Sequence, residues 1–180
     1  MIPDRFYRVR RLSRILRLGT MASLLGLAVF FVAVALSQDL MTAMVTKNFG
    51  PDIVGLRITP VEHALLTLIT GIALMPAGWA LVSLVQLFTS FAQGDVLSPR
   101  AARCLLGLGQ AMVIAALAGV LAGALASVAL TWDMPDGERT LMLNISSNTI
   151  SAALFGGLMI TVGWAMREAA LQAEENRSFV

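Results

Sequence analysis

Few side chains in this chain have the chemistry of a catalytic or metal-binding group. The sequence contains one cysteine, Cys104, and one histidine, His63. These counts exclude an internal disulfide, a cysteine-rich zinc cluster and a metal or haem held by two histidines. His63 follows Glu62, but one carboxylate and one imidazole do not make a metal site without further donors. The sequence also has no Gly-rich phosphate loop and no Ser/His/Asp set. We therefore expect neither an enzyme nor a bound cofactor.

The densest group of hydrogen-bonding side chains opens the fourth apolar stretch of the chain. Asn144, Ser147, Asn148 and Ser151 recur at helical spacing, so that on a helix they share one face. Such a polar stripe is suited to line an outward-facing vestibule that binds a small polar ligand. In the alternative interpretation, these side chains hydrogen-bond to neighbouring helices or lie among lipid head groups, as is ordinary in membrane proteins.

Pro76, in the second apolar stretch, is a further candidate. It lacks an N–H donor and leaves the carbonyl of Ile72 without its helical partner. Such a break can form a hinge or a ligand site near the middle of the membrane, although a tolerated kink is the simpler interpretation. No charged residue lies well inside any apolar stretch, which argues against an ion-coupled transporter.

Four long apolar stretches must position these residues. The chain is 57% hydrophobic and 13% charged, against about 25% charged residues in soluble domains. The stretches cover about 18–37, 64–88, 104–131 and 142–166, and each has the length of about 20 residues that a helix needs to cross a bilayer. The alternating polarity of a β-barrel is absent. The sequence predicts an all-α membrane protein, with a four-transmembrane-helix bundle as the single domain over 1–180.

Basic residues predict the orientation of this bundle. Ten of the 13 Lys and Arg residues precede the first stretch, separate the second from the third, or follow the fourth. Because positively charged segments stay in the cytoplasm, both termini are expected there. As an alternative, the first stretch is a cleaved signal, since Ala33, Val34 and Ala35 resemble a cleavage site; its apolar run is longer than the usual 7–15 residues.

The two cytoplasmic ends have opposite charge. Residues 1–17 form a basic arm, which we expect to be an amphipathic helix that attracts anionic lipid; nucleic acid is the less favoured partner and is not expected. The tail, 167–180, is acidic. The arginines that share one side of the arm are Arg10, Arg11, Arg14 and Arg17, and the tail carboxylates are Glu168, Glu174 and Glu175.

The third stretch separates small residues from bulky ones. Ala115, Gly119 and Gly123 lie on one side of the expected helix, and Leu117 and Leu121 lie on the other. Because helices in lipid associate through close backbone approach, the small side is expected to face protein and the bulky side lipid. We expect these three residues, and Gly156 in the fourth stretch, to pack helices of one chain together. Homodimerisation through the same face is the alternative.

The connections carry helix-ending signals. Gly94 suits the left-handed position after a helix, and Ser98 and Pro99 suit the cap and first position of the next. The second and fourth helices are therefore expected to extend beyond the membrane into the cytosol. Residues 38–61 are expected to form a loop with a short interfacial piece. The other outward connection contains three acidic residues, Asp133, Asp136 and Glu138. A weak metal or proton site on this side is a minor alternative.

Several segments resemble an uncharacterised bacterial family, domain of unknown function 2975. Leu87 and Phe88, then 91–98 and 101–107, are similar to its signature of helix, Gly, hydrophobic residue, short turn and helix. Residues 169–176 are similar to its ending, in which Leu precedes Glu-Asn, whereas 177–180 depart from the acidic and β-branched pattern that follows. The resemblance implies a four-span bacterial inner-membrane protein whose relatives often accompany small DNA-binding regulators, and it implies no catalytic residue.

Together these patterns favour a non-enzymatic membrane protein that acts through contacts with lipid or protein. A cytosolic partner would bind the inner turn at Gly94 and the acidic tail, and a second copy of the chain is the other possible protein partner. The alternative function is a small-solute transporter or pore. The residues assigned to that alternative are Pro76, Asn144, Asn148 and Ser151.

Overall fold

The computed structural model describes residues 5–50, 58–94, 98–132 and 141–178, and its regular structure within these ranges is entirely helical. Four helices are long and apolar enough to cross a membrane: α1 (Arg5–Leu36), α3 (Pro60–Gln93), α4 (Pro99–Leu130) and α5 (Ser147–Ser178). A shorter helix, α2 (Gln38–Phe49), follows α1. The prediction of an all-α chain with four potential spanning helices is confirmed.

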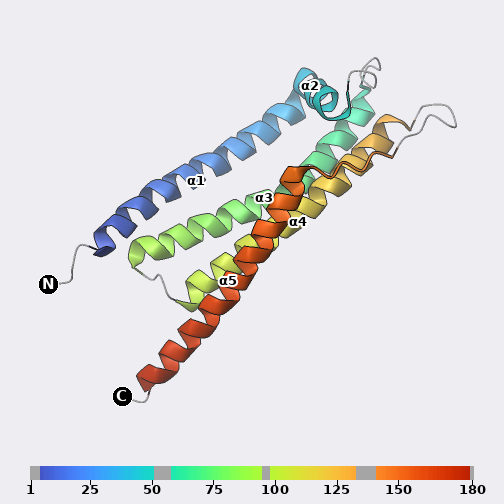
Figure 1. The fold of residues 1–180 in the computed structure, drawn as a ribbon. Helices are drawn as coiled ribbons and strands as arrows, with labels where there is room; N and C mark the ends of the chain where they lie inside the picture. Colours follow the sequence, from blue (N-terminus) through green and yellow to red (C-terminus); the bar gives the residue numbers. More distant parts are fainter. Residues whose placement is uncertain (1–4, 51–57, 95–97, 133–140, 179–180) are drawn as a thin grey trace.

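The four long helices form an open row rather than a closed bundle (Figure 1). Extensive contacts join α1 to α3, α3 to α4, and α4 to α5, and α2 also contacts α1. Among the described residues, α1 and α5 make no extensive contact with each other, as a closed four-helix bundle would require. Lipid tails are as apolar as leucine, so no hydrophobic force drives the two edges of the row together.

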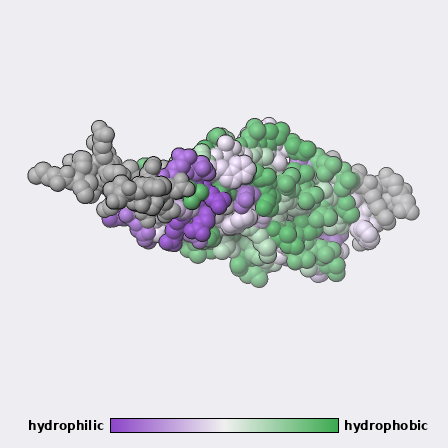
Figure 2. Space-filling model, turned by 90° about the horizontal axis from the view of Figure 1, so that it is seen from below, coloured by the Kyte–Doolittle hydropathy of each residue, from purple (hydrophilic) through white to green (hydrophobic). Residues whose placement is uncertain are grey.

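The two ends of the molecule differ in what they contain. The start of α1 and the end of α5 lie at one end, here named the terminal end, and α2 lies at the opposite end, the α2 end (Figure 1). Figure 2 shows apolar side chains over much of the visible face and hydrophilic ones gathered toward the terminal end. This distribution suits helices whose middle portions lie in hydrocarbon.

The turn between α3 and α4 has the predicted caps. Gly94 adopts φ 94° and ψ 0°, and its N–H donates to the carbonyl oxygen of Phe91 at 3.1 Å. Ser98 accepts a hydrogen bond at Oγ from the N–H of Ala101 at 3.2 Å, and Pro99 is the first residue of α4. Local sequence signals therefore set both helix ends.

The arm and the tail are continuous with the spanning helices. α1 runs unbroken from Arg5 to Leu36, so the described part of the arm is the first turns of the first long helix and not a separate interfacial helix. α5 likewise continues beyond Met166 to Ser178.

The connection predicted as a loop over 38–61 contains the twelve-residue helix α2. Ser37 caps it by accepting a hydrogen bond from the N–H of Leu40 at 3.4 Å. Met41 and Val45 of α2 are buried in one cluster with Val34 of α1, Leu66 of α3 and Leu130 of α4. This α2-end cluster fixes α2 across the ends of three long helices.

The fourth long helix starts later than predicted. Residues 141–146 are not helical, and α5 begins at Ser147. Ser146 accepts a hydrogen bond at Oγ from the N–H of Thr149 at 3.2 Å, and the N–H of Met142 donates to Oγ of Ser127 at 3.1 Å. These two hydrogen bonds, to Ser146 and to Ser127, hold residues 141–146 in a non-helical conformation although the segment is largely apolar. Asn144 therefore precedes the helix and is not part of it.

Helix packing is closest at a different glycine pair from the one predicted on α4. A Cβ built on Gly109 would lie 2.6 Å from the carbonyl oxygen of Gly156, and one on Gly156 would lie 2.8 Å from that of Gly109. A Cβ on Gly119 or Gly123 would meet no atom within 4 Å. Among the described residues, α4 and α5 therefore approach most closely farther toward the terminal end, at Gly156 of the predicted set and not at Gly119 or Gly123.

The remaining side-chain assignments on α4 fit this arrangement. Ala115 is half-buried, and the predicted lipid-facing residues Leu117 and Leu121 are exposed, as are Ile114 and Leu125. An exposed face of bulky apolar side chains suits contact with lipid.

Replacing Gly109 or Gly156 by Ala is expected to destabilise the fold by about 1–3 kcal/mol, because the new methyl group meets backbone that cannot easily move. The matched substitutions Gly119→Ala and Gly123→Ala point into open space and should change stability by less than about 0.5 kcal/mol. Denaturant titration of the purified variants in detergent measures the difference. Equal stability losses at both pairs would contradict the observed site of close approach.

Candidate functional site

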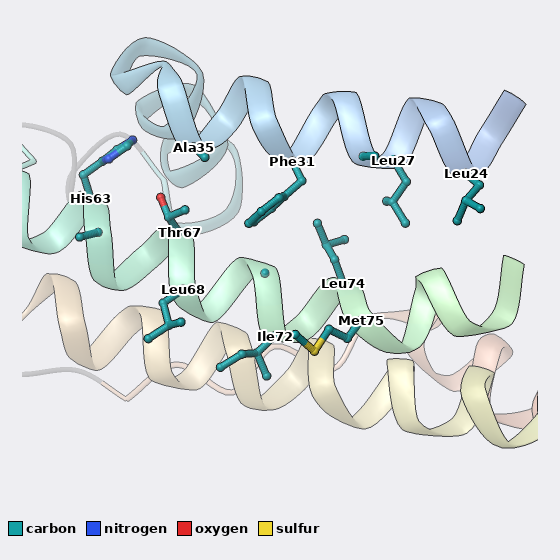
Figure 3. Close-up of a pocket in the computed structure, with 13 residues that line it drawn as sticks. Leu24, Leu27, Phe31, Ala35, His63, Thr67, Leu68, Ile72, Leu74 and Met75 are labelled. Carbon is teal, nitrogen blue, oxygen red and sulfur yellow. The ribbon is translucent and has the colours of Figure 1, made fainter. Parts of the chain in front are cut away.

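A cavity of about 810 Å³ lies between α1 and α3 and is here named the α1–α3 groove (Figure 3). It is partly open to its surroundings. Most side chains around it are apolar. Those from α1 are Leu24, Leu27, Ala28, Phe31 and Ala35; those from α3 are His63, Ala64, Thr67, Leu68, Gly71, Ile72, Leu74 and Met75.

Phe31 and Gly71 set the spacing of the two helices beside the groove. A Cβ on Gly71 would lie 3.0 Å from Cζ of Phe31, so the aromatic ring rests close to the bare backbone of α3. Figure 3 shows this ring projecting from α1 into the gap between the helices. The α1–α3 interface therefore holds a bulky ring where the α4–α5 interface holds two glycines.

Two polar side chains interrupt the apolar lining. His63 and Thr67 lie at one end of the groove beside Ala35, and Leu24 lies at the other (Figure 3). His63 Nε2 and Thr67 Oγ1 are both inaccessible to solvent and have no hydrogen-bond partner. Unpaired buried polar atoms are rare in folded proteins and point to a missing partner.

Glu62 is not free to act beside His63. Its Oε2 accepts a hydrogen bond from the N–H of Thr59 at 2.7 Å, and its own N–H donates to Oγ1 of Thr59 at 3.3 Å. This reciprocal pair is a capping box, with Pro60 at the first helical position. The spacing Thr-x-x-Glu is a sequence signal that the sequence analysis missed. The acidic residues once considered for a metal site, Asp133, Asp136 and Glu138, lie outside the described residues.

A second groove of about 410 Å³ is lined by α2, α3, α4 and residues 142–149, and we name it the α4 groove. Gly119 and Gly123 form part of its floor, and Leu66 and Thr70 of α3 form part of one wall. Its polar lining comes from several segments. These side chains are Asn48, Thr70, Asn144, Ser146 and Thr149.

The predicted vestibule residues do not come together in this groove. Asn144 lines it, but Asn148 and Ser151 are exposed on α5 and line none of the described cavities. Pro76 is half-buried within α3, which continues as a helix through it. Figure 1 shows α3 changing direction along its length, as a proline inside a helix causes. Pro76 therefore acts as a tolerated kink rather than a break in the helix.

The basic arm meets α3 at the terminal end. Arg14 and Arg17 line a small hollow of about 240 Å³ with Thr89 and Gln93 from the last turns of α3. Cations are favoured there because the carbonyl groups at a helix C-terminus carry partial negative charge. Arg11 is exposed, and the side chain of Arg10 lies outside the described part of the structure.

Comparisons with known proteins give no relative for this chain. No protein-family model, curated protein or solved structure matches it. The resemblance to domain of unknown function 2975 stays a prediction.

Proposed function

We propose that this chain is a non-enzymatic, multi-pass membrane protein that acts through contacts with lipid, and that the α1–α3 groove holds a lipid chain. One observation carries the proposal: an open, largely apolar cavity of about 810 Å³ separates two helices that are suited to lie in a bilayer.

Lipid is the occupant that this lining favours. Water fills cavities that offer it several polar partners, whereas apolar cavities stay dry. A dry space left empty forfeits dispersion contacts on all its walls. In a bilayer the groove opens onto hydrocarbon, so an acyl chain can enter and restore those contacts without losing any hydration.

The orientation of the protein is part of the same proposal. The basic side chains of Arg11, Arg14 and Arg17 belong to the terminal end of the row. The positive-inside rule supports a cytoplasmic terminal end in a bacterial inner membrane, with α2 on the outer side. In this orientation α3 and α5 extend into the cytosol at their C-terminal ends.

A reporter domain that works only in the cytoplasm is expected to be active when fused after Val180 and inactive when inserted after Gly50, between α2 and α3. A reporter that works only outside should give the reverse. The reason is that four crossings return the chain to its starting side, whereas Gly50 follows a single crossing. A cytoplasmic reporter that is active after Gly50 and inactive after Val180 would contradict the proposed orientation.

Substituting Ala28→Phe in the α1–α3 groove is expected to lower the retention of lipid about tenfold. The ring would fill space whose apolar burial is worth about 1.5–3 kcal/mol to an occupant. The control is Ala22→Phe, at an exposed position on the same helix that does not line the groove. Native mass spectrometry after detergent extraction measures the bound lipid. Equal retention by both variants would contradict a lipid-binding groove.

A solute carrier is the second candidate function, favoured by the polar side chains of the α4 groove. If that groove passes solute, Asn144→Leu should slow glycerol flux into reconstituted vesicles about fivefold, the effect of one lost hydrogen bond of about 1 kcal/mol. Asn148→Leu serves as the matched control, because Asn148 does not line the groove. The proposal of lipid contact instead expects no flux above that of protein-free vesicles.

A further inference from the structure

We propose that the α1–α3 groove recognises the ester-linked acyl chain of a glycerolipid, with His63 and Thr67 hydrogen-bonding to its ester carbonyl. This inference rests on the proposed function and deepens it by naming the ligand class. It is carried by the position of two unpaired polar atoms at one end of an otherwise apolar groove.

Thr67 differs in its hydrogen bonding from several other hydroxyl-bearing residues of α1 and α3. Thr20 donates to the carbonyl of Leu16 at 2.8 Å, and Thr89 donates to that of Val85 at 2.7 Å, each four residues back. This local bond is the usual way to satisfy a hydroxyl in an apolar helix. Thr67 Oγ1 makes no hydrogen bond although it is shielded from solvent. Because Thr67 lines the groove, rotation about its Cα–Cβ bond would turn this unpaired hydroxyl toward a molecule there.

His63 supplies a second donor on the same face. It precedes Thr67 by four residues, which places the two side chains about one helical turn of 5.4 Å apart. A neutral imidazole with its proton on Nε2 donates one hydrogen bond from that atom, and the threonine hydroxyl donates another. Figure 3 shows both side chains at the same end of the groove. A carbonyl oxygen has two lone pairs and can accept from both.

The length of the groove matches one leaflet. His63 and Met75 lie twelve residues apart on α3, which corresponds to about 18 Å along the helix. Half of a hydrocarbon core is about 15 Å. His63 is in the first turns of α3, so the polar end of the groove lies at the α2 end and the apolar end lies near mid-membrane. A lipid of the adjacent leaflet has its ester group at the level of the polar end of the groove, and its acyl chain extends from there toward the apolar end.

The groove runs about 18 Å along α3 and is lined mostly by apolar side chains, which suits an extended acyl chain. The neutral lining also argues against direct capture of a phosphate, which is bound most strongly by arginine or lysine. An acyl chain that carries an uncharged acceptor at its head satisfies both the shape and the polar pair.

The test loads the purified full-length chain with palmitoyl-oleoyl phosphatidylethanolamine or with its ether-linked analogue, which lacks the ester carbonyls. Native mass spectrometry then measures the lipid retained. The wild-type chain is expected to retain the ester lipid at least about fivefold better, the effect of one hydrogen bond of about 1 kcal/mol. Thr67→Val and His63→Leu should each reduce or abolish this preference. Equal retention of the two lipids by the wild-type chain would overturn the inference.

Matched variants separate recognition from folding. Thr70→Val is the control, because Thr70 lines the α4 groove and not the α1–α3 groove. Thr67→Ser and His63→Gln keep a donor at each position and should restore the preference for the ester. A full ester preference in Thr67→Val and His63→Leu would contradict the proposed hydrogen bonds.

The inference and the proposed function fail in different ways. If Ala28→Phe expels the lipid while Thr67→Val and His63→Leu leave retention and ester preference unchanged, the groove binds lipid but does not recognise its ester. In that case the inference falls and the proposed function stands. If Ala28→Phe also retains lipid like the wild-type chain, both are overturned.

Discussion

Helices in a bilayer gain nothing by hiding apolar side chains from one another, because lipid is just as apolar. They stay together only where their surfaces approach closely. At the α4–α5 interface Gly109 and Gly156 contribute no side chain of their own, so the backbones of the two helices approach closely. At the α1–α3 interface Phe31 projects onto Gly71 instead. This difference in side-chain volume accounts for a tight crossing on one side of the row and an open groove on the other.

The second constraint is that backbone and hydroxyl groups must find hydrogen-bond partners without water. Most of those described here do so locally, through helix caps and bonds to the carbonyl four residues back. Ser127 also accepts from the N–H of Met142 and so holds the extended segment before α5 against α4. His63 Nε2 and Thr67 Oγ1 stand out against this background. Because both residues lie at one end of the α1–α3 groove, that end is polar and the rest of the groove is apolar.

A buried cluster lies near these two polar atoms at the α2 end. Val34 of α1, Leu66 of α3, and Met41 and Val45 of α2 belong to it. Leu66 directly precedes Thr67 on α3, so the polar end of the groove lies at the same level of the helix as this cluster. The other end lies among Leu24, Leu74 and Met75, near the middle of the two helices. The groove therefore has one polar end and one apolar end, which is the arrangement on which the proposal of a lipid ligand rests.

Local features of this protein follow from its sequence: the four apolar helices, the turn at Gly94, the cap at Ser98 and the bulky exposed face around Leu117 and Leu121. They depend on hydropathy and on neighbours a few residues away. Which glycines touch, whether the helices close into a bundle, and whether Asn144 meets Asn148 depend on distances between segments far apart in the chain. Periodicity marks the faces of a helix but does not say which face finds a partner, and only the tertiary structure decided that.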